Sequence, residues 1–308
     1  MNETITPVVL LVLALLLTGP APALLARARW PLAVPRAALV LWQALALAAV
    51  LSALGAGASA GTLVMMHSSP GPGVVVLHAV ALVLTLVVAA RLLWSAHTLG
   101  MALRARRRRQ RHLVDLVGRP DQRAPGALVL DAARPVAYCI PGLPSRLVVS
   151  TPALDGLAPA EVDAVLAHER AHARARHDLV LEAFSVLHNA FPRVVRSRAA
   201  LEATAGLVEM LADDAARRRC GPVPLARALA RLADAPVPAG TLGSGAVSPA
   251  VRIRRLASGD AACPGSVAGA VPAWLLAALA YAAAVALVVV PTVAVAAPWL
   301  TAVATTLT

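Results

Sequence analysis

Hydrophobic residues are concentrated in four long stretches of the chain, and polar residues in one block between the third stretch and the fourth. The apolar stretches comprise residues 8–26, 37–54, 74–90 and 271–290. Each is close to the roughly 20 residues that a helix needs to cross a bilayer, so the pattern predicts four transmembrane helices. Glu3 and the absence of Arg before the first stretch favour a retained span over a cleaved signal peptide.

The polar block is about as long as one protein domain. Among the acidic residues only Glu3 lies outside residues 115–260. We therefore divide the chain into three transmembrane helices in residues 1–99, a polar domain in residues 100–265, and a fourth transmembrane helix with a short tail in residues 266–308.

The polar domain combines strand-like and helical patterns, as an α+β fold does. Residues 104–117 should continue the third span as a helix. Short β-like runs, separated by Pro and Gly, follow at residues 127–131, 135–140 and 146–150. Pro159 suits the first turn of a long helix, which we expect to run unbroken to about Ala190. A second helix is expected over residues 197–219, where Gly221 and Pro222 then stop it.

The overall composition agrees with a membrane protein and excludes several other classes. Hydrophobic residues make up 59% of the chain and charged residues 14%, whereas about 25% of a soluble domain is charged. Disordered, collagen-like and coiled-coil proteins are therefore excluded. The three cysteines are odd in number and widely spaced, so we expect neither a disulfide framework nor a CxxC metal site.

The net charge of +12 is explained by the positions of the arginines. They flank the apolar stretches at Arg27, Arg29 and Arg36, in the RARRRRQR run of residues 104–111, and at Arg252, Arg254 and Arg255. By the positive-inside rule the chain is a multi-pass cell-membrane protein, with the polar domain in the cytoplasm and both termini outside. The basic run could bind nucleic acid. Beside a span we interpret it as a topology signal that touches anionic lipid, and we expect no direct nucleic-acid partner.

One motif in the polar domain indicates chemistry. Residues 168–172 read His168-Glu169-Arg170-Ala171-His172, which is HExxH. Two histidines four residues apart share a helix face, so both imidazoles can reach one zinc ion. Glu169 follows directly and can act as the general base that takes a proton from the attacking water. The motif therefore predicts a Zn²⁺-dependent hydrolase.

A catalytic zinc needs a third protein ligand, and two residues could supply it. Glu209 lies in LVEMLADDAA on the second helix, with Asp213 one turn later to orient a ligating histidine from the second shell. Asp178 lies six residues after His172, as the last ligand of a metzincin would. We favour Glu209, because a metzincin needs the chain to turn back before Asp178 and we see no helix breaker there.

The chain resembles the integral-membrane zinc metallopeptidases of the β-lactam sensor-transducer (antirepressor) type, and more distantly the CAAX prenyl proteases and heat-shock membrane proteases. The residues that carry the resemblance are PVAYCIPGLPSRLVVSTPALDGLAPAEVDAVLAHERAHARARHD, LVEMLADDAA and the arrangement of spans. The resemblance implies a gluzincin-like domain inserted into an α-helical membrane protein with four spans. It implies His168, His172 and Glu209 as ligands, Glu169 as base and Asp213 as second-shell residue.

This sequence departs from that pattern at its end, because only a short tail follows the fourth span. We therefore expect no extracellular sensor domain and no β-lactam sensing. The expected function is a membrane-bound endopeptidase that cleaves a cytoplasmic or membrane-proximal protein, with a transcriptional repressor or the chain itself as candidates. The alternative is a non-catalytic signalling scaffold whose zinc site is structural or vestigial.

Two further roles stay open at this point. Residues 146–150 could form an edge strand above the zinc cleft that pairs with substrate backbone, or a plain core strand. His177, His188 or Asn189 could stabilise the oxyanion, although packing or surface roles are the commoner explanation for such residues.

Overall fold

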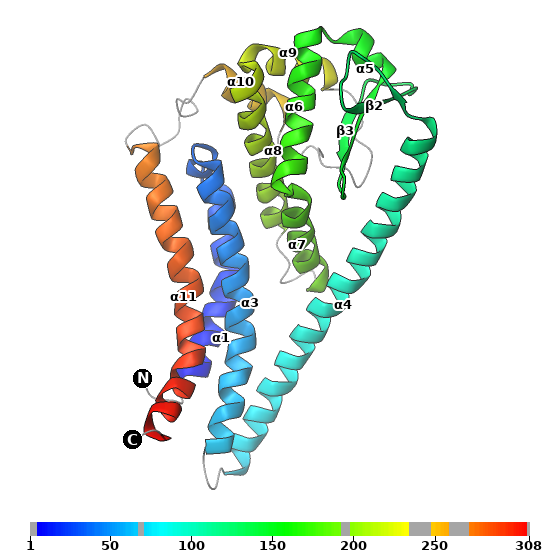
Figure 1. The fold of residues 1–308 in the computed structure, drawn as a ribbon. Coiled ribbons are helices and arrows are strands. Elements are labelled where there is room, and N and C mark those ends of the chain that lie inside the picture. The colour runs from blue at the N-terminus through cyan, green and yellow to red at the C-terminus, as the bar shows by residue number, and fades with distance from the viewer. Residues whose placement is uncertain (1–4, 67–70, 192–197, 234–247, 259–270, 307–308) are drawn as a thin grey trace.

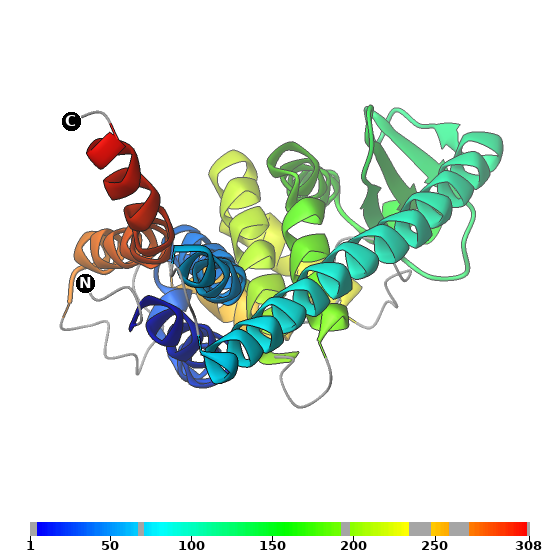
Figure 2. The same cartoon turned by 90° about the horizontal axis from the view of Figure 1, so that it is seen from below.

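The computed structural model describes residues 5–66, 71–191, 198–233, 248–258 and 271–306. The group of helices that contains the candidate spans, here named the membrane part, consists of α1 (Ile5–Thr18), α2 (Pro20–Arg27), η1 (Trp30–Leu32), α3 (Pro35–Met66), α4 (Pro72–Val117) and α11 (Ala273–Thr306). Helices α1, α3 and α11 lie side by side, whereas α4 meets the end of α3 and then leans away from it (Figures 1 and 2). Within the described ranges, four helical segments are long and apolar enough to cross a membrane, which is consistent with a membrane protein.

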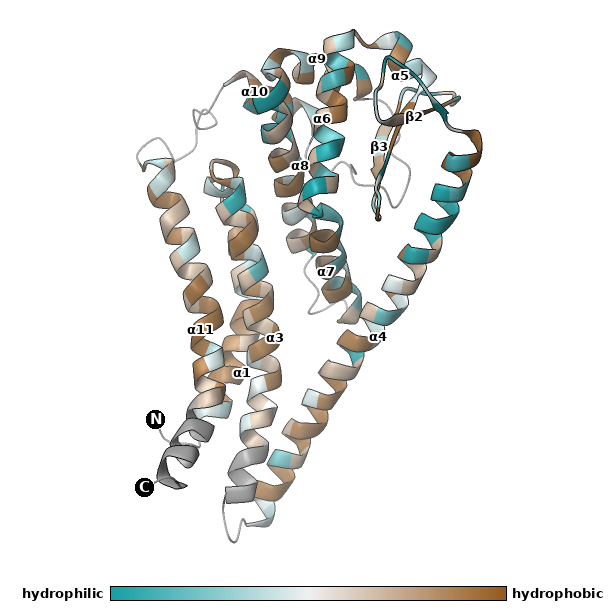
Figure 3. Cartoon of the chain, viewed as in Figure 1, coloured by the Kyte–Doolittle hydropathy of each residue, from teal (hydrophilic) through white to brown (hydrophobic). Residues whose placement is uncertain are grey.

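Helix α4 joins the membrane part to the polar domain without interruption. Its 46 residues correspond to about 70 Å of helix, more than twice the hydrocarbon thickness of a bilayer. Its first half is apolar and its second half carries the basic run, a change visible in Figure 3. The expected helical continuation over residues 104–117 is therefore present.

A small sheet follows α4, with strands β1 (Arg119–Pro120), β2 (Ala127–Leu130), β3 (Ala137–Ile140) and β4 (Arg146–Ser150). Its strand order is β1-β2-β4-β3, so β4 lies inside the sheet and β3 at its edge. Strand β4 is parallel to β2 and antiparallel to β3. The edge-strand interpretation of residues 146–150 is thus wrong. Leu147 and Val149 pack on one face and Val148 on the other, so apolar side chains cover β4 on both sides.

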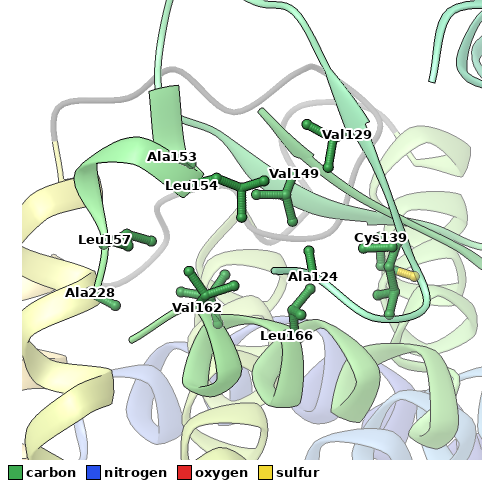
Figure 4. Packing of buried hydrophobic residues seen from close by; sticks show 13 residues of the cluster. Ala124, Val129, Cys139, Val149, Ala153, Leu154, Leu157, Val162, Leu166 and Ala228 are labelled. Atoms are coloured by element: carbon green, nitrogen blue, oxygen red, sulfur yellow. The ribbon is translucent and has the colours of Figure 1, made fainter. Parts of the chain in front are cut away.

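The described residues of the domain also form the helices α5 (Thr151–Gly156), α6 (Pro159–Ala175), α7 (His177–Ala190), α8 (Arg198–Cys220), α9 (Pro222–Leu232) and α10 (Pro249–Ala257). The main core lies between the sheet and α6. Val162 and Leu166 of α6 pack there against Val149 of β4 and Leu154 of α5 (Figure 4). This core fixes the face of α6 that is turned toward the sheet.

The expected unbroken helix from Pro159 to Ala190 is wrong, because it ends at Ala175 and a second helix begins at His177. Arg176 between them has φ 51° and ψ 42°, the left-handed conformation. A non-glycine residue pays roughly 1–2 kcal/mol for this conformation. Contacts with α4 hold the second helix in its direction: Arg91 of α4 donates to the carbonyl of Ala190, and Ser95 donates to that of Val186. The break thus directs α7 along α4, as Figure 1 shows.

The polar domain also shares a core with the membrane part. Trp42 of α3 packs in one cluster with Phe184 of α7 and with Leu207 and Val208 of α8. Helix α8 is therefore held between α6 and the beginning of α3. This contact fixes the position of α8, which faces the HExxH motif of α6.

Candidate metal centre

Helix α6 and helix α8 bring the two motif histidines and one glutamate together. The Nε2 atoms of His168 and His172 lie 3.1 Å apart. Oε2 of Glu209 lies 3.5 Å from Nε2 of His168, and its Oε1 lies 3.5 Å from Nε2 of His172. All three side chains are buried, and one ligand atom from each falls within 4.8 Å of the others.

The second nitrogen of each imidazole faces a partner outside this cluster. Nδ1 of His168 lies 3.0 Å from Oδ1 of Asp213, which is one helical turn after Glu209 on α8. Nδ1 of His172 lies 3.1 Å from Nδ1 of His177, the first residue of α7. Both imidazoles therefore point Nε2 into the cluster, and an outer partner fixes the orientation of each ring.

Arg252 of α10 is a site residue that the sequence analysis did not find. Its Nε and Nη2 donate to both oxygens of Asp213, at 2.7 and 2.6 Å, and its Nη1 lies 2.9 Å from Oε2 of Glu209. A forked guanidinium binds carboxylates in this way with fixed geometry. Arg252 lies far from the motif in sequence and beside the fourth span, where it was interpreted only as part of the charge asymmetry.

Glu169 is buried beside the cluster with one free carboxylate oxygen. The backbone N–H of Cys139 on the edge strand β3 donates to this carboxylate. Its Oε2 has no hydrogen-bond partner among the described residues. Burial, more than the neighbouring charges, raises the pKa of Glu169 to about 7. A carboxylate with that pKa accepts and returns protons near neutral pH.

Charge in the cluster is distributed unequally between the imidazoles. Burial lowers the pKa of His172 to about 3, so this ring is neutral. Burial also opposes the charged form of His168, but Asp213 and Glu209 outweigh it and raise the pKa of His168 to about 10. A metal ion bound at Nε2 takes the place of such a proton, because ligating imidazole is neutral.

The other proposed residues lie outside the cluster. Asp178 is buried on α7, where its carboxylate lies 3.6 Å from Arg107 of α4 and 3.5 Å from Arg176. The carboxylate beside the two imidazoles is thus that of Glu209. Of the three oxyanion candidates only His177 contacts a motif residue. Nδ1 of His188 is buried without a partner among the described residues, and Asn189 is exposed.

The chemistry of this donor set fits zinc. Two imidazole nitrogens and a carboxylate oxygen are common catalytic zinc ligands, and bond lengths of about 2.0–2.1 Å separate tetrahedral ligands by about 3.3 Å. The observed separations of 3.1 and 3.5 Å between the ligand atoms are close to that value. The residues present therefore suit a metal ion with two histidine ligands and one glutamate ligand.

Comparison with known proteins agrees with this geometry. The model of peptidase family M48 matches residues 103–232, from the second half of α4 to the last residue of α9. No curated protein and no solved structure matches the chain. The match contains the HExxH helix and Glu209 but ends before Arg252. The similarity of residues 103–232 to peptidase family M48 thus supports a zinc metallopeptidase family for this chain.

Proposed function

We propose that this protein is a membrane-bound zinc endopeptidase that cleaves a cytoplasmic or membrane-proximal protein, with His168, His172 and Glu209 as the zinc ligands. The observation that carries the proposal is the free Oε2 of Glu169, buried beside two imidazoles and a carboxylate. A purely structural zinc site is closed by four protein ligands and needs no such base. When bound, zinc would act as a Lewis acid and lower the pKa of a water toward about 7.

The residues of this chain perform the remaining steps. Glu169 takes a proton from the water while the oxygen of that water forms a bond to the scissile carbonyl carbon. The same carboxyl then gives that proton to the leaving amine as the C–N bond breaks, so the base is regenerated. Asp213 and His177 hold the rings of His168 and His172, and Arg252 holds Asp213 and Glu209, so the ligands do not reorganise during the reaction.

The edge strand β3 gives the substrate a place to bind. Its free edge can add an extended peptide by backbone hydrogen bonds. The N–H of Cys139 donates to Glu169, so this strand passes directly beside the base. A peptide paired with β3 would therefore place its carbonyls near Glu169 and the two imidazoles.

Topology and regulation are part of the same proposal. The arginine distribution supports a cytoplasmic domain with both termini outside. The resemblance to the antirepressor proteases supports a transcriptional repressor or the chain itself as substrate, and hence a role in signal transduction.

The test is the Glu169→Gln variant of the full chain, purified with zinc in detergent or nanodiscs. Glu202→Gln, an exposed position on α8, is the matched control. We expect Glu169→Gln to retain one zinc per chain and to lose at least about 100-fold in cleavage of casein and of the chain itself. Unchanged cleavage by Glu169→Gln contradicts the mechanism. A zinc-loaded wild type without cleavage and with a closed fourth coordination position supports the signalling scaffold instead.

A further inference from the structure

A cavity lies next to the metal centre, because His177, which contacts His172, is one of its lining residues. Its volume is about 580 Å³, and it is lined by α3, α6, the first residue of α7, α8 and α11. The first turn of α3 and residues Ala277 and Tyr281 of α11 form one side of it, and both helices are candidate membrane spans. The cavity therefore lies at the end of the membrane part from which the polar domain extends, where lipid headgroups are expected.

Four arginines of this cavity have no ion-pair or hydrogen-bond partner among the described residues: Arg36 of α3, Arg174 of α6, and Arg218 and Arg219 of α8. All four are exposed. They come from three helices that are distant in sequence, so the fold itself gathers their charges. Other arginines of the domain are used differently: Arg107, Arg252 and Arg255, for example, each bind carboxylates.

The acidic residue of the cavity does not neutralise these charges. Asp214 is held by Arg255 of α10, with Nη1–Oδ1 and Nη2–Oδ2 distances of 2.7 and 2.9 Å. Arg170 also lines the cavity, but its guanidinium donates to the carbonyl of Pro125. The cavity is thus strongly cationic, and bringing four like charges together is unfavourable unless an anion accompanies them.

We propose that this cavity binds the phosphate headgroup of an anionic phospholipid. Guanidinium groups bind phosphate oxygens in a forked geometry, which explains the residue type. The apolar wall formed by α3 and α11 explains why the phosphate belongs to a lipid. Tyr281 is 40% exposed and Val285, one turn deeper on α11, is 63% exposed, so an acyl chain can follow this helix. The basic run of α4 is not required for this binding.

The proposal goes beyond the peptidase function and does not depend on it. Lipid binding and the metal centre are nevertheless connected, because Arg174 lies on the same helix as the motif histidines. A headgroup bound to Arg174 and to α8 would hold both metal-carrying helices at the membrane surface.

The experiment measures lipid binding to the full chain in detergent micelles by native mass spectrometry. Phosphatidylglycerol and phosphatidylcholine with identical acyl chains are titrated separately. The test variant is Arg174→Gln/Arg218→Gln/Arg219→Gln. The milder Arg218→Gln/Arg219→Gln variant tests the same cavity in case the triple variant does not fold. The matched control, Arg106→Gln/Arg108→Gln/Arg109→Gln, removes the same charge from exposed arginines of α4. Thermal unfolding followed by tryptophan fluorescence shows that each variant is folded.

We expect the wild type and the α4 variant to bind one phosphatidylglycerol with a preference of about tenfold or more over phosphatidylcholine. The triple cavity variant should lose this preference, and the double variant most of it. Equal binding of the two lipids by the wild type overturns the proposal, as does an equal loss in the α4 variant. Displacement of the lipid by millimolar inorganic phosphate would assign the cavity to a free anion rather than a lipid.

Discussion

The metal centre and the neighbouring cavity, both lined by α6 and α8, place charged groups in opposite ways. In the metal centre, two carboxylates of α8 meet positive or titratable partners: Asp213 meets Arg252 and His168, and Glu209 meets Arg252 and both imidazoles. In the cavity, Arg174 of α6 and Arg218 and Arg219 of α8 have no such partners among the described residues. The difference teaches that the first region pairs its positive groups with its own carboxylates, whereas the second presents arginines without a carboxylate partner.

The largest effect is expected on removing a motif histidine. His172→Ala deletes one of three ligand atoms, so zinc affinity should fall by more than the roughly 100-fold that an outer-shell change costs. Metal analysis of the purified chain should find less than one tenth of the wild-type zinc. His112→Ala, on the exposed part of α4, should leave the zinc content unchanged. Wild-type zinc content in His172→Ala would place the metal elsewhere.

A pH-dependent stability difference is expected at Glu169 in the zinc-free protein. Its pKa is about 7 in the folded chain and about 4.3 when unfolded, so the folded state favours its protonated form. The stability present below pH 4.3 is therefore lost as pH rises through 7, by about 4 kcal/mol. The Glu169→Gln variant, which cannot ionise, should unfold at a higher temperature than wild type at pH 8, and the gap should close at pH 4. Melting curves with a chelator measure this, and a gap independent of pH contradicts it.

The third effect is expected at Arg252, which contacts Asp213 and Glu209 in the metal centre. Arg252→Gln removes the bonds that orient Asp213 and Glu209, so zinc affinity should fall about 10–100-fold. Competition with a fluorescent chelator measures this affinity. Arg254→Gln is the control, since Arg254 is an exposed neighbour on α10. An equal loss in both variants would mean that Arg252 acts only through net charge.

The smallest effect is expected for an exposed ion pair on α8. Arg198 and Glu202 are one turn apart, with Nε–Oε1 at 2.8 Å, and both side chains are exposed. Solvent screening reduces such a pair to about 0.5 kcal/mol or less. Glu202→Gln should therefore change the free energy of unfolding within that limit, measured by chemical denaturation. A larger change would show that position 202 supports the packing of α8.

Regular patterns made much of the fold predictable from sequence. Apolar stretches of span length located the four candidate membrane helices, and four-residue spacing placed His168 with His172 and Glu209 with Asp213 on common helix faces. These signals are local, because each depends on residues within one helix. The choice of Glu209 over Asp178 depended in addition on an expected unbroken helix, which is wrong, and on the family resemblance. Glu209 is nevertheless the carboxylate that lies beside the two imidazoles.

Contacts between distant segments were not predictable in this way. No glycine or proline in the sequence indicates the break at Arg176. Contacts with α4 hold α7 in a direction that differs from that of α6. Arg252 reaches the site from a separate helix, and no spacing rule connects it to Asp213. The edge position of β3 rather than β4 depends on which strand pairs with β2. Each of these features is set by tertiary packing.

The most direct test of the central claim is the position of zinc in an experimental structure of the zinc-loaded full chain, located by anomalous scattering at the zinc edge. We predict one zinc within about 2.0–2.2 Å of Nε2 of His168, Nε2 of His172 and a carboxylate oxygen of Glu209, with its fourth position open toward Glu169. Zinc bound by Asp178, or enclosed by four protein ligands, would contradict the account.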